Sequence, residues 1–204
     1  GHLGHEVVRA LGDGSTWGVH ITYVEQEETL GIAHAVSRLE PHVDRPFFLF
    51  LGDIFFATEN LASMVERLRS DRNVAGVLAC RREGNLEAIK RNFIVLTGPD
   101  GFVHRVIEKP RHPRTDLKGC GIYLFDQSFF DAVRRTPRTA MRNEYEITDS
   151  IQIFLDDGYK VEAAEVVKAD MNVSYPADLL ELNLRLLAQS GAKNFLAANV
   201  QLAR

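Results

Sequence analysis

An aspartate stands directly after one of the most apolar stretches of the chain. Residues 46–51 (PFFLFL) are typical of a strand buried on both faces, and Gly52 and Asp53 follow at once. In open parallel sheets, ligands bind outside the carboxyl ends of the strands. We therefore expect Asp53 at the mouth of a site. The alternative interpretation is a turn aspartate that hydrogen-bonds its own backbone.

A glutamine and a glycine form the second candidate pair, in the segment YVEQEETLGIAHA. The amide of Gln26 can present a donor and an acceptor together, as the edge of a pyrimidine base requires. Gly31 would let the backbone come close to a flat ring. The alternative is an ordinary loop glutamine followed by a glycine that opens a helix.

Charged residues follow two later strands. In VIEKP, Lys109 beside Pro110 offers a fixed point charge to a phosphate, although Glu108 and Lys109 could also form a surface ion pair of little energetic value. In KADMNVSYP, Lys168, Asp170 and Asn172 alternate along a strand end, so all three could face one cleft.

Three acids stand immediately before or within the start of an apolar helix, in RNEYEITDS. Glu144, Glu146 and Asp149 fit ordinary helix capping and helix-dipole chemistry. Two carboxylates could equally hold vicinal sugar hydroxyls. Both interpretations stay open at this point.

Alternating strand and helix patterns must position these residues. The first half of the chain predicts a βαβαβ alternation, hence a parallel sheet covered by helices with right-handed crossovers. The second half adds a β-hairpin at a Pro-Asp-Gly turn. The predicted fold is therefore α/β, a Rossmann-like mixed but mostly parallel sheet flanked by helices, with an inserted hairpin and a single domain. Predicted helices cover residues 3–11, 30–42, 59–71, 127–136, 148–158 and 174–191. Predicted strands cover residues 19–26, 45–53, 73–81, 118–126 and 159–167, and the two strands of the predicted hairpin lie within residues 92–110.

The composition is that of an ordinary globular protein. The chain has 204 residues, 45% of them hydrophobic, and a formal net charge of −4, which gives no reason to expect nucleic acid or an anionic membrane as partner. Cys80 and Cys120 lie in apolar strands without metal-ligand spacing, so we expect buried thiols and a reducing, cytoplasmic location. No apolar stretch approaches the roughly 20 residues of a membrane span.

The order of these motifs resembles that of the sugar-1-phosphate nucleotidyltransferases, in particular the glucose-1-phosphate thymidylyltransferase type. The resemblance runs from residue 1 to about residue 187, and its most specific parts are LGDGSTWGVHITYVEQEETLGIAHAV and EYEITDSIQ. It implies an enzyme that joins a nucleoside triphosphate to a sugar-1-phosphate with Mg²⁺ and releases pyrophosphate. dTTP or UTP and glucose-1-phosphate are the favoured substrates, and we expect a homo-oligomer.

The resemblance also implies roles for individual residues. Gln26 and Gly31 would contact the base, and Asp53 would hold the metal. Lys109 would bind the sugar phosphate, while Gly121 and Glu146 would line the sugar pocket. These assignments make Asp53 and Lys109 the catalytic candidates.

The second metal ligand stays open between two residues. Relatives often end the last strand in a Trp-x-Asp pattern, whereas the aligned position here is Asn172, with Asp170 two residues earlier. An anion binds Mg²⁺ better than an amide, which favours Asp170, but the alignment favours Asn172.

Relatives also begin with a Gly-rich loop followed by Thr-Arg, for which we find no counterpart. We therefore expect residues 1–204 to form one nucleotidyltransferase domain without its first Gly-rich βαβ part, and residues 188–204 to begin a C-terminal extension. The alternative function is a non-catalytic relative that binds a sugar nucleotide or regulates a partner.

Overall fold

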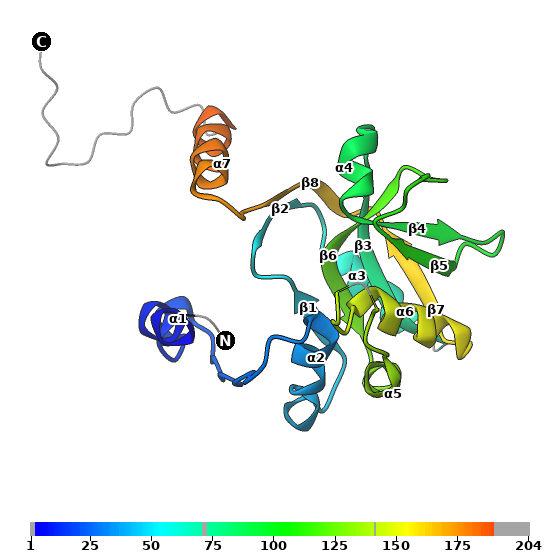
Figure 1. Ribbon diagram of the computed structural model, residues 1–204, viewed down its shortest axis with the longest axis horizontal. Helices are drawn as coiled ribbons and strands as arrows, with labels where there is room; N and C mark the ends of the chain where they lie inside the picture. The colour runs from blue at the N-terminus through cyan, green and yellow to red at the C-terminus, as the bar shows by residue number, and fades with distance from the viewer. Residues whose placement is uncertain (1–2, 71–72, 141, 190–204) are drawn as a thin grey trace, which may run out of the picture.

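The main sheet is mixed, and most of its strand pairs are antiparallel. The computed structural model describes residues 3–70, 73–140 and 142–189. Within them, a six-stranded sheet has the order β5-β4-β6-β3-β7, and β1 also pairs with β6 (Figure 1). Its strands are β1 (Phe47–Phe50), β3 (Val74–Arg82), β4 (Phe93–Thr97), β5 (Val103–Glu108), β6 (Leu117–Phe125) and β7 (Lys160–Ala164).

The predicted mostly parallel sheet is therefore wrong, and β6 is the reason. β6 pairs antiparallel with β1 on one side and with β3 on the other, and only β3 and β7 pair in parallel among the described strands. β1 and β3 do run in the same direction, as the βαβ pattern predicts, but β6 lies between them. Hydrophobic periodicity identifies strands and does not identify their neighbours.

A separate two-stranded sheet carries two of the candidate metal ligands, Asp170 and Asn172, and the third, Asp53, directly precedes it. β2 (Ile54–Thr58) pairs antiparallel with β8 (Val167–Asn172), with Ile54 opposite Asn172. Strand β2 was not predicted, because only Gly52 and Asp53 separate it from the apolar run that ends at Leu51. The predicted strand at 159–167 covers β7 and only the first residue of β8, whereas the predicted strand end at Asn172 is confirmed.

The sheet is packed on both faces, and alternation along its strands divides the core. Tyr123 and Phe125 of β6 pack on one face with Phe129 and Phe154, while Ile122 and Leu124 pack on the other with Met64. The helices on the first face are α2 (Ile32–Ser37), α5 (Phe129–Arg135) and α6 (Ile147–Asp156), and the opposite face carries α3 (Ala62–Ser70).

Two helices lie away from this core, on one side of the molecule (Figure 1). α1 (Gly4–Leu11) has no buried residue, and α7 (Pro176–Gln189) has only Leu182 buried in its described part. Both helices confirm their predictions, as do α3, α5 and α6. The predicted strand at 19–26 is wrong, because this segment runs without regular structure. Short elements complete the fold: η1 (Ser15–Trp17), η2 (Glu40–His42) and α4 (Leu86–Lys90).

Two further predictions concern cysteines and membranes. Cys80 and Cys120 are free and buried, as expected. None of the helices in the described ranges combines the length and the apolar character that a bilayer crossing needs. The predicted extension at 188–204 lies almost wholly outside the described residues.

Candidate active site

A cavity of about 500 Å³ opens where β1 leaves the main sheet. Its walls come from the start of α2, the turn between β1 and β2, the ends of β5 and β8, the middle of β6 and the start of α6. Segments that are far apart in the sequence therefore meet at one place. Six of the eight predicted site residues line this cavity: Gly31, Asp53, Lys109, Gly121, Glu146 and Asn172.

Asp53 and Asn172 lie side by side at the open end of the two-stranded sheet. Ile54 is opposite Asn172 in the ladder, and the backbone N–H of Val173 donates to the Asp53 carbonyl at 2.8 Å. Both side chains belong to exposed residues on the cavity wall. The turn after β1 and the end of β8 therefore place one carboxylate and one amide on the wall of the same cavity.

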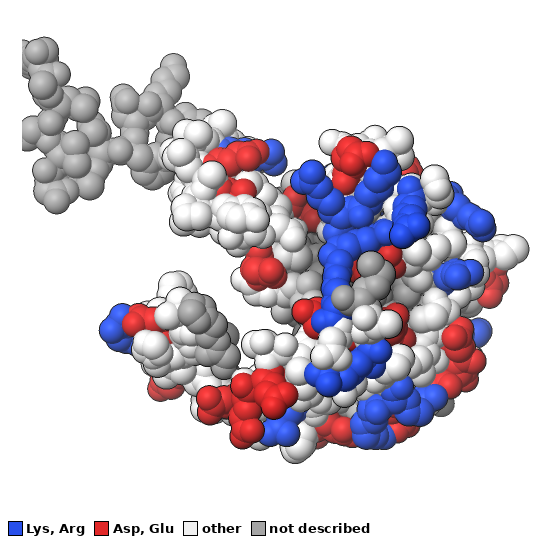
Figure 2. Space-filling view, viewed as in Figure 1, with Lys and Arg blue, Asp and Glu red and all other residues white. Residues whose placement is uncertain are grey.

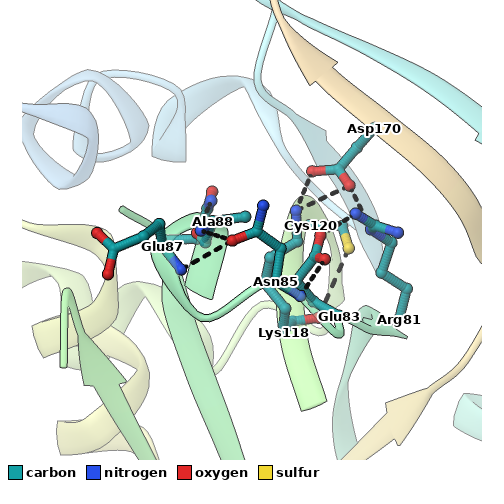
Figure 3. Close-up of polar contacts among 9 residues, drawn as sticks. Arg81, Glu83, Asn85, Glu87, Ala88, Lys118, Cys120 and Asp170 are labelled. Atoms are coloured by element: carbon teal, nitrogen blue, oxygen red, sulfur yellow. Dashed lines mark hydrogen bonds and ion pairs between the residues drawn. The ribbon is translucent and has the colours of Figure 1, made fainter. Parts of the chain in front are cut away.

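Asp170, the other candidate for the second ligand, is buried elsewhere. Its side chain is 3% exposed, and its carboxylate accepts hydrogen bonds from Lys118 Nζ at 2.6 and 2.8 Å and from Arg81 Nε at 2.7 Å (Figure 3). Asp170 is not on the cavity wall. Of the two residues that the sequence left open, only Asn172 reaches the cavity.

Gly121 and Gly31 both have positive φ angles, and each has a structural reason to be glycine. At Gly121 (φ 70°), a Cβ would lie 3.0 Å from Ile54 Cδ1 and 3.1 Å from Leu51 Cδ1. At Gly31 (φ 102°), a Cβ would lie 2.6 Å from the carbonyl oxygen of Tyr145. Backbone contact within the chain, at the start of α2, therefore explains Gly31 without any flat ring.

Gln26 is the second predicted residue that does not line the cavity. Its Nε2 lies 2.9 Å from His34 Nδ1 and 3.4 Å from the carbonyl oxygen of Gly31. Both neighbours can accept a hydrogen bond, so the amide nitrogen is engaged within the chain. The Oε1 acceptor is then the group with which Gln26 can contact a ligand.

Lys109 stands on the cavity wall with an unusual backbone conformation. Its φ angle is 44°, directly before Pro110, and its N–H donates to the carbonyl oxygen of Asn92 at 2.9 Å. Its Nζ lies 3.9 Å from Glu108 Oε1, so the two side chains form only a loose pair. A non-glycine residue in this region is uncommon and marks a position that the surrounding structure holds in place.

Acids and cations meet on the wall near α6. Glu146, the N-cap residue of α6, pairs with Arg142 at 3.1 Å. Burial raises the pKa of Glu108, and the neighbouring carboxylate of Glu146 adds to this rise. Burial also raises the pKa of Asp149, again with a contribution from Glu146. This wall therefore combines hydrogen-bonding carboxyl groups with fixed positive charges.

Several cavity residues with charged or hydroxyl side chains were not predicted from the sequence. Arg91 and Arg142 line the cavity beside Lys109, so three cations face it although the whole chain is acidic. Thr148 lines it too, with a buried hydroxyl that has no hydrogen-bond partner in the structure. Arg142 stands two residues before Glu144, the first acid of the motif EYEITD, and this position was the available signal.

The charge distribution over the surface agrees with this local excess. Figure 2 shows Lys and Arg side chains gathered in front of α4, β4 and β5, whereas white and red dominate on α1 and α7. Clefts lined by one sign of charge concentrate ligands of the opposite sign. The cavity is thus suited to an anionic ligand such as a phosphate ester.

The cavity residues fit a magnesium ion. Mg²⁺ usually takes one or two protein oxygens, and phosphates and water complete its coordination. Asp53 and Asn172 supply a carboxylate and an amide oxygen on one wall. The described residues contain no cluster of three or more His, Cys, Asp or Glu that could hold a metal ion.

Comparisons with known proteins agree with this geometry. The model of the family described as "Nucleotidyl transferase" matches residues 2–188. Agl11, a low-salt glycan biosynthesis nucleotidyltransferase of Haloferax volcanii, is 35% identical over 95% of this chain and 53% of its own length. A glucose-1-phosphate thymidylyltransferase of Streptomyces antibioticus is 33% identical over 92% of this chain and 51% of its own length. The chain thus spans about half the length of these two curated relatives.

A third relative and a solved structure extend the comparison. AglF of Haloferax volcanii, a UTP–glucose-1-phosphate uridylyltransferase, is 35% identical over 83% of this chain and 68% of its own length. The structure of a putative glucose-1-phosphate thymidylyltransferase from Bacillus anthracis superposes with a TM-score of 0.75 at 24% identity. That superposition covers 95% of this chain and 74% of the other, and it establishes the similarity of fold.

Proposed function

Because the chain belongs to the nucleotidyl transferase family, we propose that its protein joins a nucleoside triphosphate to a sugar-1-phosphate and releases pyrophosphate. The observation that carries the proposal is the cavity, where residues from segments far apart in the sequence meet. It offers a carboxylate at Asp53, three cations for phosphates, and carboxyl and hydroxyl groups for a sugar. Such a reaction needs positioning and charge stabilisation more than covalent chemistry by the protein.

In this proposal, the two exposed residues at the end of the two-stranded sheet hold Mg²⁺. Asp53 supplies the carboxylate, and Asn172 supplies the second oxygen. When bound, Mg²⁺ would neutralise charge on the α-phosphate of the nucleotide. Asp53 thereby keeps this phosphate at a fixed place against the cavity wall.

The opposite wall would hold the sugar-1-phosphate. Lys109 and Arg142 would bind its phosphate, and Glu146 would accept hydrogen bonds from the sugar hydroxyls. Gly121, which has no side chain, leaves room for the sugar against β6. No general base is required, because a phosphate monoester is largely ionised at pH 7 and its oxygen can attack directly.

Gln26 and Gly31 would contact the base. The Gln26 nitrogen is engaged by His34 and Gly31, so its free Oε1 would accept a hydrogen bond from the base. The N3–H of thymine or uracil is such a donor, and so is the N1–H of guanine. The names of the relatives favour dTTP or UTP among these, and glucose-1-phosphate as the sugar substrate.

A substrate panel tests the proposed function. Pyrophosphate release by the full-length protein should be measured with Mg²⁺, each of dTTP, UTP, GTP, CTP and ATP, and glucose-1-phosphate, galactose-1-phosphate or N-acetylglucosamine-1-phosphate. We expect the highest kcat/KM with dTTP or UTP and glucose-1-phosphate. Absence of pyrophosphate release with every pair would contradict the proposal. Cytoplasmic location and a homo-oligomeric state stay predictions, and light scattering of the same preparation tests the second.

A further inference from the structure

We propose that the buried ion pair between Lys118 and Asp170, together with Arg81, positions the metal-binding end of β8. This inference rests on the proposed function. It makes Lys118 and Asp170 positioning residues that act through Asn172. Figure 3 shows both side chains and Arg81 meeting between β6, β3 and β8.

The cluster is dense, buried and balanced in charge. The side chains of Lys118 and Asp170 are 4% and 3% exposed, and three hydrogen bonds of 2.6–2.8 Å reach the Asp170 carboxylate. Arg81 also pairs with Glu83, whose other oxygen accepts from the N–H of Asn85 at 2.9 Å. Two cations thus face two anions, which is the condition for burying charge at tolerable cost.

The pair joins the two strands that bring Gly121 and Asn172 to the cavity. Lys118 lies three residues before Gly121 on β6, and Asp170 lies two residues before Asn172 on β8. Among the described strands, β8 forms ladder hydrogen bonds with β2 and with no strand of the main sheet. Side chains must therefore set where the end of β8 lies relative to β6.

Apolar contacts alone do not fix this position. At the other end of β8, Val167 packs in the apolar cluster around Met64, and such packing is not directional. Charge-assisted hydrogen bonds are short and directional. Asp170 is the residue through which β8 is fixed to β6 before the strand reaches Asn172. Sliding β8 along β6 would break all three bonds to its carboxylate.

A direct metal-ligand role for Asp170 makes the opposite prediction for one substitution. If Asp170 bound the metal, Lys118→Met would remove a competing cation and tighten metal binding. If Asp170 positions Asn172, the same change loosens the end of β8 and weakens metal binding. The sign of the change therefore separates the two roles.

The experiment measures Mn²⁺ binding by the full-length protein, using the electron paramagnetic resonance signal of the free ion. For Lys118→Met we expect the Mn²⁺ dissociation constant to rise about tenfold, the effect typical of residues that support metal ligands. In the pyrophosphate assay, the KM for sugar-1-phosphate should stay within about twofold while kcat falls. Arg67→Met/Glu162→Gln is the matched control, because it removes an ion pair away from the cavity, between α3 and β7.

A double variant covers the risk that the single variant does not fold. Lys118→Met/Asp170→Leu removes both buried charges and leaves Arg81 paired with Glu83, and such apolar replacements often preserve stability. We expect it to melt within a few degrees of the wild type and still bind Mn²⁺ about tenfold more weakly. Unchanged or tighter Mn²⁺ binding in the folded variants would overturn the inference, as would loss of the fold in both.

The outcomes for the two proposals remain separate. A wild-type protein that binds Mn²⁺ but releases no pyrophosphate contradicts the proposed function, whereas the ratio of dissociation constants still decides the positioning role. A wild-type protein that leaves all Mn²⁺ free contradicts the metal assignment, and the positioning role with it.

Discussion

The middle and the outer end of the β2–β8 sheet differ in burial although both carry polar side chains. In the middle, Asp170, opposite Phe56, is 3% exposed and bound by Lys118 and Arg81. At the outer end, Asp53 and Asn172 are exposed on the cavity wall. One strand thus carries a structural acid and, two residues later, a residue open to a ligand.

The difference shows what makes a carboxylate available to a metal. Strand alternation places Asp170 and Asn172 on the same side of β8, so it does not distinguish them. The neighbours decide, because a carboxylate that already accepts three charge-assisted hydrogen bonds has little capacity left for an ion. Substitutions at the two places should therefore have different effects: on activity at the outer end of the sheet, and on stability in its middle.

The largest expected effect is on catalysis at the outer end. Asp53→Asn keeps the size of an exposed side chain and removes its charge, so the fold should remain. Loss of metal charge stabilisation should reduce kcat by about 100-fold or more in the pyrophosphate assay. Asp44→Asn is the matched control, since Asp44 is exposed near the other end of β1 and pairs only with Arg45 in the structure. Activity of Asp53→Asn within a few-fold of wild type would exclude Asp53 as the main ligand.

In the middle of the sheet, at Asp170, the expected loss is in stability. Asp170→Ala leaves the ammonium of Lys118 buried without its main partner, and breaking a buried pair costs about 3 kcal/mol. Asn172→Ala, at the exposed end, should change the free energy of unfolding by less than about 0.5 kcal/mol. Urea unfolding of both variants checks the contrast. Equal losses of unfolding free energy in the two variants would contradict the contrast between a buried Asp170 and an exposed Asn172.

A smaller effect is expected for Lys109→Ala on the opposite wall. Loss of one charge-assisted hydrogen bond should raise the KM for sugar-1-phosphate about tenfold, with a smaller change in the KM for the triphosphate. Lys168→Ala is the control, because Lys168 pairs with Glu59 at 2.9 Å on an exposed surface. A larger rise in the triphosphate KM would mean that Lys109 binds the other phosphate.

The smallest effect concerns pH. Glu108 has a raised pKa in the folded protein, mainly because it is buried, so the folded state holds the proton more tightly than the unfolded state. Stability should therefore fall as pH rises from the unfolded pKa, near 4.5, through the higher folded pKa. Glu108→Gln should be more stable than the wild type at pH 7, and the difference should vanish below about pH 4.

Glu87→Gln provides the opposite sign as a control. A hydrogen bond from Lys90 lowers the pKa of Glu87, so this exposed acid should favour the folded state at neutral pH and lose that effect as pH falls through its pKa. Thermal melts from pH 4 to pH 8 compare both variants with wild type. A Glu108→Gln variant less stable than wild type at pH 7 would contradict the burial argument.

Local patterns in the sequence predicted much of the fold because local forces determine those elements. The hairpin of β4 and β5 follows from its Pro-Asp-Gly turn, and α6 and α7 follow from their apolar periodicity and flanking residues. The direction of the main sheet could not be predicted, since β6 inserts between β1 and β3 from more than 30 residues away in the sequence. Strand β2 was missed because only Gly52 and Asp53 separate it from the apolar run before it.

The candidate site was predictable in part for the same reason. Asp53, Lys109 and Glu146 each end or begin an element, and the polar ends of elements meet at one cavity. Alternation could not separate Asp170 from Asn172, because the deciding partner, Lys118, stands 52 residues away on another strand. Arg142 was not predicted, although it stands in the same segment, RNEYEITDS, as the predicted Glu146.

Adding a carboxylate at position 172 is the most direct test of the metal site at Asp53 and Asn172. Asn172→Asp places an anion beside Asp53, and Mg²⁺ and Mn²⁺ bind carboxylates more strongly than amides. The control, Ser174→Asp, adds the same charge two residues further on, outside the cavity wall. We predict that the Mn²⁺ dissociation constant of the full-length protein falls about tenfold for Asn172→Asp and stays unchanged for Ser174→Asp. Equal affinity in Asn172→Asp and the wild type would contradict the assignment of the outer end of β8 to the metal.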